Sequence, residues 1–323
     1  MQGEAVESFR CRICDNSDDN FRYSALEMML GTRESFDYIQ CGRCGCLQIE
    51  EYPGDIGKYY PPDYYAYKDP TPTKKSCKQK IIHLRDRHEL GFRSFAGMLL
   101  SKYRPNSDLR NISRHGLCPG HKILDVGCGS GSLLIKLRDL GLSNLFGIDP
   151  LFEPSNHHNG VSISKSYLSE TSGKFDFIML NHSFEHMPDP AQQFSHLQRL
   201  LSRDGVCMVR VPVSSSYAWS HYGINWVQLD APRHFYLHTP KSIATLAKKS
   251  GLELFDIQYD STYFQFAGSE LYSRNISLKE SENVAANNYS KKMIQKLQRK
   301  AEKLNAMGLG DQAVFYLRQP NTQ

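Results

Sequence analysis

The chain has 323 residues, of which 40% are hydrophobic and 23% charged, so it is long enough for one large domain and a small one. Its net charge of +5 is too small to indicate a nucleic-acid partner, although it favours an acidic small substrate. The first ten residues lack the apolar core of a signal peptide, and no stretch approaches the ~20 apolar residues of a membrane span, so we expect a soluble, cytoplasmic protein. Nine cysteines, an odd number, argue against a closed disulfide framework.

Residues 1–50 carry two Cys-x-x-Cys pairs, Cys11 with Cys14 and Cys41 with Cys44. Paired knuckles of this kind predict a tetrahedral site in which four thiolates hold a structural zinc ion. Redox-active pairs are the weaker alternative, because neither pair begins a helix in a βαβ pattern. A segment this short needs a metal to fold, so residues 1–50 are predicted to be a small zinc-ribbon-like module.

Residues 51–115 read as a linker followed by a helix. The linker is rich in tyrosine and proline, and two roles for its tyrosines remain open: they stack on a substrate ring, or they pin the linker onto the next domain. Residues 76–103 then show helical periodicity with many cations, which a solvated helix face explains.

From residue 116 to residue 323 the pattern alternates between strands and helices, which predicts a parallel sheet covered by helices on both faces. Strands are expected at 121–126, 144–149, 160–164, 175–181, 205–212 and 252–259, and helices at 132–140, 190–201 and 239–250. Residues 260–311 look like an insertion with a basic helix at about 284–307. Residues 312–317 are predicted to return to the sheet as an edge strand.

The first of these strands runs directly into three glycines at alternate positions, Gly127, Gly129 and Gly131, followed at once by a helical pattern. Such a junction lets the backbone approach a ligand closely and offers free N–H groups at a helix N-terminus. The spacing is not that of dinucleotide folds, and no Gly-Lys-Ser/Thr follows, so a phosphate-binding P-loop is excluded. A ligand with a ribose but no phosphates fits better.

Three stretches of the chain together resemble the class I S-adenosylmethionine (SAM) methyltransferases, namely residues 123–131, 147–149 and 175–190. The resemblance implies a Rossmann-like, seven-stranded, doubly wound α/β sheet, here with the small Cys₄ module before it. It implies that the glycines pass close to the methionine part of SAM, that Asp149 holds the ribose hydroxyls, and that Asp125 helps position the ammonium group. The cofactor-binding residues implied are Asp125, Gly127, Cys128, Gly129, Gly131, Asp149, Pro150, Asn181 and His182.

The order of modules resembles a narrower group, the bacterial methyltransferases of sugar and surface-glycan pathways, whose acceptor chemistry lies after the fifth strand. Relatives that C-methylate nucleotide-linked deoxysugars carry Tyr-x-Glu-His there; His234 matches the histidine, but Arg233 replaces the glutamate. The expectation is therefore O-methylation of a sugar hydroxyl in glycan or nucleotide-sugar biosynthesis, with a sugar, nucleotide-sugar or glycan substrate. C-methylation of a deoxysugar remains the alternative.

An alcohol must lose its proton during attack, and histidine suits the task because its pKa lies near neutrality. The candidate bases are His234, His182, His186 and Asp230, with His234 first because Asp230 and Arg233 flank it in sequence. An RNA methyltransferase that binds through the zinc module, and a SAM-binding protein without activity, are further alternatives. Dispersed basic residues argue against the former and the intact glycine motif against the latter. The sequence leaves the oligomeric state open.

Overall fold

The computed structural model describes residues 3–6, 9–61, 77–92, 94–153, 160–281 and 289–320. These residues form two compact units, each assembled from separated stretches of chain. Unit 1 comprises Met1–Pro61, His182–Phe194 and Arg210–Phe315, and unit 2 comprises Pro62–Asn181, Ser195–Val209 and Tyr316–Gln323. Half of the tyrosine-rich linker at residues 51–72, from residue 62 onward, lies outside the described residues.

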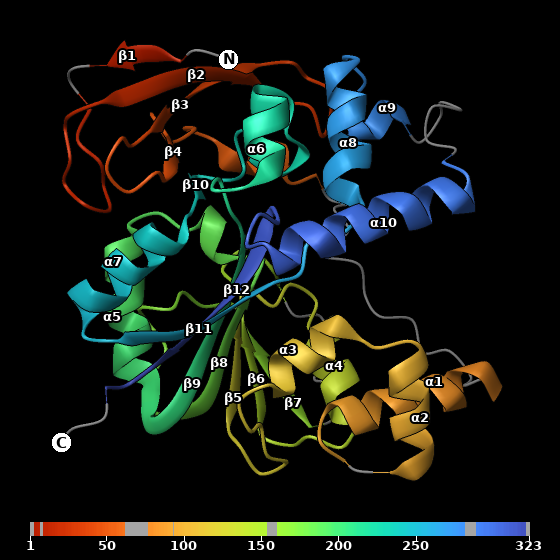
Figure 1. Ribbon diagram of the computed structural model, residues 1–323. Coiled ribbons are helices and arrows are strands. Elements are labelled where there is room, and N and C mark those ends of the chain that lie inside the picture. Colours follow the sequence, from red (N-terminus) through yellow and green to blue (C-terminus); the bar gives the residue numbers. More distant parts are fainter. Residues whose placement is uncertain are drawn as a thin grey trace. The chain divides into compact units, whose positions relative to one another are not determined.

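Unit 1 contains a five-stranded antiparallel sheet in the order β1-β2-β3-β4-β10. Four strands come from the start of the chain: β1 (Glu4–Val6), β2 (Asn20–Leu26), β3 (Ser35–Gln40) and β4 (Leu47–Ile49). The fifth, β10 (Tyr236–Leu237), pairs with β4 although it comes from the later part of the sequence (Figure 1). The N-terminal knuckles are thus tied by backbone hydrogen bonds to the segment next to His234.

A seven-stranded sheet has the order β11-β12-β9-β8-β5-β6-β7. Its strands are β5 (Ile123–Val126), β6 (Leu145–Ile148), β7 (Val161–Ser164), β8 (Phe175–Asn181), β9 (Leu201–Pro212), β11 (Glu253–Tyr259) and β12 (Gln312–Arg318). Within unit 2, β5 pairs in parallel with both β6 and β8, and β6 pairs in parallel with β7 (Figure 1). The predicted Rossmann-like sheet is therefore confirmed.

The prediction that residues 312–317 form an edge strand is wrong. β12 lies between β11 and β9, and all six of these residues are buried. A run of this kind, apolar on both faces of the strand, is typical of an interior position rather than an edge.

The helices of unit 2 follow the predicted pattern with two exceptions: one predicted helix is interrupted, and the helix at Ser107–Ser113 was not expected. α4 (Ser132–Asp139) follows the glycine loop, while α1 (Cys77–Glu89), α2 (Phe95–Tyr103) and α3 (Ser107–Ser113) precede the sheet. The predicted single helix at 76–103 is interrupted, because Gly91 takes a positive φ and the side chain of Ser94 caps a new helix by accepting from the Gly97 amide.

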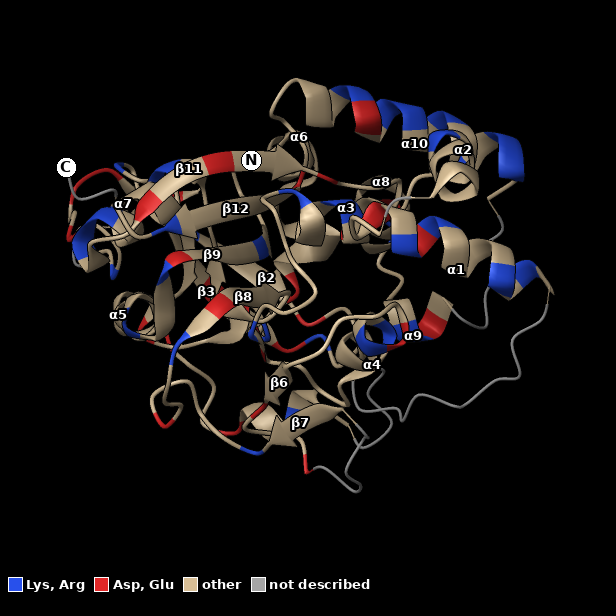
Figure 2. Ribbon diagram, turned by 90° about the horizontal axis from the view of Figure 1, so that it is seen from below, with Lys and Arg blue, Asp and Glu red and all other residues tan. Residues whose placement is uncertain are grey.

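α5 (Pro190–Leu200) belongs partly to each unit, and the other helices lie in unit 1. In α7 (Pro240–Ser250), Thr239 is the N-cap and forms a capping box with Ser242, and Pro240 takes the first helical position. The inserted stretch carries α8 (Phe264–Ser273), α9 (Leu278–Ser281) and α10 (Lys291–Ala306), and the cations of α10 are spread along it (Figure 2). None of the helices in the described ranges is long and apolar enough to span a bilayer.

Candidate functional site

The glycine loop of unit 2 connects β5 to α4 and is built from backbone conformations that side chains resist. Gly127, Gly129 and Gly131 all have positive φ, at 77°, 51° and 74°. A Cβ atom on Gly131 would lie 2.2 Å from Cδ1 of Ile163, so glycine is required there for packing as well as for φ. Where the strand ends, the loop therefore has a backbone conformation that requires glycine.

Asp149 follows β6, the neighbour of β5, so its carboxylate and the glycine loop meet at the carboxyl ends of parallel strands. Its side chain is nearly buried and accepts three backbone hydrogen bonds. Gly129 N–H donates to Oδ2 at 2.9 Å, while Leu151 and Phe152 donate to Oδ1 at 2.9 and 3.1 Å. A carboxylate has about four acceptor positions, so one remains for a ligand without rearrangement of this loop.

The other predicted cofactor residues of unit 2 are close to this loop in sequence or sheet register. Asp125 is the third residue of β5 and is buried; burial and the nearby Asp149 charge raise its pKa to about 7. Burial likewise raises the pKa of the Cys128 thiol, which makes it a poor nucleophile. Pro150 follows Asp149 directly, and Asn181 is the last residue of β8.

Five side chains of unit 1 form what we call the carboxylate–histidine cluster: His182, Glu185, His186, Asp230 and His234. They come from two segments, the residues after β8 and the residues before β10. The two segments are joined by backbone, since Phe235 N–H donates to Glu185 C=O at 2.8 Å. The rings of His186 and His234 lie 4.7 Å apart, centroid to centroid.

Glu185 is the centre of the cluster and is fully buried. Its Oε1 lies 3.4 Å from His182 Nδ1 and 3.9 Å from His234 Nε2. Burial alone would raise the carboxyl pKa, but the contact with His182 and the charges of His186 and His234 outweigh it and lower the pKa to about 2. Glu185 is therefore ionised at neutral pH.

The three histidines of the cluster differ in their environments. Burial, reinforced by the neighbouring His234, lowers the pKa of His186 to about 4, so this ring is neutral at pH 7. His234 is buried, and the His182 side chain is one-third exposed. His182 also takes a left-handed backbone conformation, with φ of 57°, which is unusual for a residue with a side chain.

Asp230 forms an ion pair with Arg233. Arg233, which is fully buried, donates through Nε to Asp230 Oδ2 at 2.9 Å and through its second nitrogen to Oδ1. Burial would raise the pKa of Asp230, but the Arg233 charge outweighs it and lowers the pKa. Asp230 is thus a weak base. Its Oδ2 also lies 3.7 Å from His234 Nε2, which suits Asp230 to orienting that ring.

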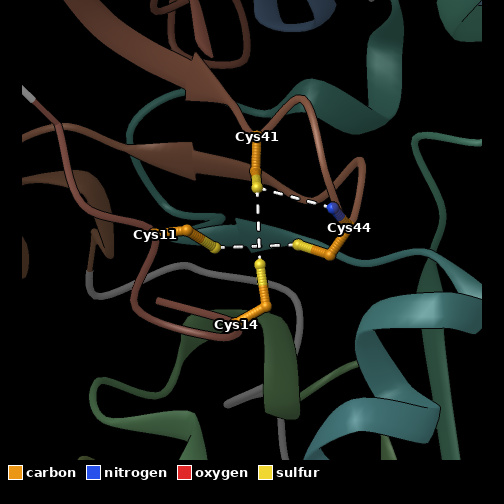
Figure 3. A group of neighbouring side chains, drawn as sticks. All are labelled: Cys11, Cys14, Cys41 and Cys44. Carbon is orange, nitrogen blue, oxygen red and sulfur yellow. Dashed lines mark hydrogen bonds between the residues drawn. The ribbon is translucent and has the colours of Figure 1, made fainter. Parts of the chain in front are cut away.

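The four predicted zinc ligands lie together in unit 1 (Figure 3). The Sγ atoms of Cys11 and Cys44 are 3.6 Å apart, as are those of Cys14 and Cys41. Backbone N–H groups of the knuckles point at sulfur, from Ile13 to Cys11 and from Cys44 to Cys41, each at 3.4 Å. Cys46, also buried, is outside this group of four.

Residues 87–257, more than half of the chain, match the family described as "Methyltransferase domain". The chain belongs to this methyltransferase family. It is a SAM-dependent enzyme with the class I fold expected from its motifs.

Curated relatives carry a more specific name. A ubiquinone biosynthesis O-methyltransferase of Pseudomonas aeruginosa is 27% identical over 183 residues, which cover 49% of this chain and 77% of that protein. The protein of the same name from Psychrobacter arcticus is 31% identical over 173 residues, covering 47% and 66% of the two chains. A solved SAM-dependent methyltransferase from Archaeoglobus fulgidus aligns with a TM-score of 0.40 and 17% identity, covering 70% of this chain and all of that one.

The sugar assignment from the sequence is wrong. The relatives named above are ubiquinone biosynthesis enzymes, so the expected carbohydrate substrate, nucleotide-sugar partner and polysaccharide pathway, with the C-methylation and RNA alternatives, are withdrawn. The physical reason is that the motifs carrying the resemblance are the ones expected to bind SAM, and SAM binding is common to methyltransferases with unrelated acceptors.

Sequence reasoning missed two members of this methyltransferase's candidate site. Glu185 stood inside the quoted motif at 175–190 but was given no role, although a carboxylate next to a histidine is a signal for one. Tyr60, from the tyrosine-rich segment, has its hydroxyl 3.0 Å from His186 Nδ1. The other described tyrosines of the segment contact protein: Tyr59 donates to Glu34 at 2.7 Å, and Tyr52 meets the Tyr236 hydroxyl.

Proposed function

We propose that this methyltransferase moves the methyl group of SAM to a ring hydroxyl of a phenolic compound of the ubiquinone-precursor class. The observation that carries the acceptor is the shared name of its relatives, which specifies oxygen as the methylated atom. The cofactor residues already described support the other half of the reaction. A phenolic hydroxyl fits a histidine-based site, because its pKa near 10 lies only a few units above that of imidazole.

In the proposed cofactor site, the glycine loop lies against the methionine part of SAM and the Asp149 carboxylate accepts a ribose hydroxyl. Asp149 is held for this by the Gly129, Leu151 and Phe152 amides, which fix the position of the carboxylate at the end of β6. Asp125, Cys128, Pro150 and Asn181 complete the proposed contacts, with Asp125 on the ammonium side.

We assign proton removal to the carboxylate–histidine cluster, with His182 as the base. The methyl group of a sulfonium is already activated, so catalysis needs orientation of the acceptor and removal of its proton. The Glu185 carboxylate, with Oε1 3.4 Å from His182 Nδ1, is close enough to stabilise a protonated imidazole by its charge. The His182 side chain is one-third exposed and so can be reached by a substrate, whereas His234, the first choice from sequence, is buried.

We also propose that Cys11, Cys14, Cys41 and Cys44 hold a structural zinc ion. Four thiolates bound at ~2.3 Å in a tetrahedron place their sulfur atoms about 3.8 Å apart, close to the 3.6 Å separations described above. The amide hydrogen bonds to sulfur, together with Gln48 Nε2 donating to Cys11 Sγ at 3.0 Å, stabilise the thiolate forms. The ion would brace the turns that enter the five-stranded sheet.

The experiment is methyl transfer from labelled SAM to a panel of phenols and catechols with ubiquinone-type side chains, with the product identified as a methyl ether. His182→Gln should lower kcat by about 10²–10⁴ while the affinity for SAM stays within twofold. His221→Gln, an exposed histidine on α6 (Tyr217–Tyr222), is the matched control and should keep full activity. Methylation on carbon or nitrogen contradicts the proposal. So does a chain that binds SAM but methylates none of the phenols.

A further inference from the structure

Glu185 has an unusual environment for a buried carboxylate. Neither of its oxygens has a hydrogen-bond partner among the described residues, although the side chain is fully buried. An ionised carboxylate without donors loses its hydration and gains nothing in return, so buried carboxylates are normally paired, hydrogen-bonded or bound to a metal. Imidazole nitrogens lie 3.4 Å from Glu185 Oε1 in His182 and 3.9 Å from it in His234, too far for strong hydrogen bonds.

Two histidines are held so that their free nitrogens are acceptors rather than donors. His186 Nδ1 lies 2.8 Å from the Arg233 carbonyl oxygen, and His234 Nδ1 lies 2.7 Å from the Gln228 carbonyl oxygen. A carbonyl only accepts, so each Nδ1 carries the proton and each neutral ring keeps a lone pair on Nε2. Backbone carbonyls bonded to the second ring nitrogen are the usual support for metal-ligating histidines.

Both rings also lie close to the Glu185 carboxylate. One ligand atom from each of Glu185, His186 and His234 lies within 4.8 Å of the other two. Ligands held about 2.1 Å from a common cation are about 3.0 to 4.2 Å apart, so the 3.9 Å between His234 Nε2 and Glu185 Oε1 is in range. Three groups with lone pairs and no proton between them repel one another unless a cation lies at their centre.

We propose that Glu185, His186 and His234 bind one divalent cation of the first transition row. Two imidazoles and one carboxylate, without a thiolate, favour manganese, iron, cobalt or zinc over calcium and magnesium. Three protein ligands leave coordination positions open for the substrate. The competing explanation is a proton on His234, which lies between Glu185 and Asp230 at 3.9 and 3.7 Å.

The role of this cation in catalysis rests on the proposed function, whereas its binding does not. A divalent cation that binds the acceptor hydroxyl lowers the pKa of that hydroxyl and holds its oxygen in place. His182 is left out of the group of three ligands and remains free to take the proton. The cation and the base would then act on the same oxygen atom of the acceptor.

The experiment is a titration of the whole chain with Mn²⁺, followed by electron paramagnetic resonance of the free ion and by calorimetry. The protein is first loaded with zinc at its cysteines and freed of other metals; Mn²⁺ is the probe because thiolates bind it poorly. One Mn²⁺ should bind per chain. Glu185→Gln and His234→Asn should each weaken binding by at least about 100-fold, and the exposed Glu51→Gln should not change it.

Absence of Mn²⁺ binding, or equal binding by the variants and the wild type, overturns the proposal in favour of a proton on His234. Two variants on different segments guard against a folding defect in either, which circular dichroism would reveal. Methylation of a phenol by a chain that binds no Mn²⁺ leaves the proposed function standing without the cation. Mn²⁺ binding by a chain that methylates no phenol removes only the proposed function.

Discussion

The Asp149 carboxylate offers the sharpest test of the cofactor site, through the substitution Asp149→Asn. This change keeps the shape of the side chain but removes its charge and one of its two acceptor oxygens. If the remaining oxygen stays with Leu151 and Phe152, the new NH₂ group faces the Gly129 amide, which is itself a donor. The variant therefore loses one charge-assisted hydrogen bond and places two donors in opposition.

The expected loss of affinity for SAM follows from this geometry. A hydrogen bond to a charged group contributes about 1.5–3 kcal/mol, which corresponds to a roughly 10- to 150-fold weaker affinity for SAM. Asp149→Ala removes all three amide hydrogen bonds and should weaken binding further. Calorimetry with SAM and with S-adenosylhomocysteine measures both changes, and the two ligands should respond alike because they share the ribose.

The matched control is Asp139→Asn on α4, an exposed aspartate paired with Arg138. It should bind SAM as the wild type does. If Asp149→Asn binds SAM within threefold of the wild type while its thermal unfolding is unchanged, Asp149 does not hold the ribose. In that case the glycine loop must bind the cofactor by another route.

Two further predictions concern the zinc ligands and the buried carboxyl of β5. Cys14→Ser should abolish the one zinc per chain measured by elemental analysis and lower the unfolding temperature by about 10 °C or more, since zinc contributes several kcal/mol and each shifts it by ~2–4 °C. Cys118→Ser, an exposed cysteine, is its control, and normal zinc content in Cys14→Ser would refute the Cys₄ site. The pKa of Asp125 is raised to about 7, so the folded state holds a proton that the unfolded state has released. Its contribution therefore lowers the free energy of unfolding as pH rises from 4 to 7, by up to about 4 kcal/mol, and changes no further above pH 7. In denaturant titrations across that range, the free energy of unfolding of Asp125→Asn should lack this pH dependence. Equal pH dependence in the variant and the wild type would exclude a contribution from Asp125.

Local features of this chain could be read from the sequence because they depend on neighbouring residues. The glycines at 127, 129 and 131 require positive φ, and the apolar β-branched runs around them predict buried parallel strands. The helix at 240–250 begins where Thr239 caps it and Pro240 follows. The two Cys-x-x-Cys pairs predicted a four-sulfur cluster, and the described structure brings all four together.

The acceptor chemistry did not follow from the sequence. Motifs that bind SAM are shared by enzymes with different acceptors, so the sugar prediction had no residue-level support beyond the match at His234. Glu185 was overlooked for a related reason: its significance comes from His234, which lies on a segment far along the chain. The relatives named for ubiquinone biosynthesis, and not a local pattern, overturned the sugar prediction.

The sequence by itself determined the glycine loop, the succession of strands and helices, and the cysteine knuckles, because each arises from contacts within a few residues. Tertiary structure decided that β12 lies inside its sheet, that β10 completes the N-terminal sheet, and that Glu185 meets His186 and His234. These outcomes depend on pairing between distant segments, where burial and hydrogen bonding over the whole fold outweigh local preference. The lone pairs at Glu185 and the two histidines became a candidate cation site only when folding placed them together.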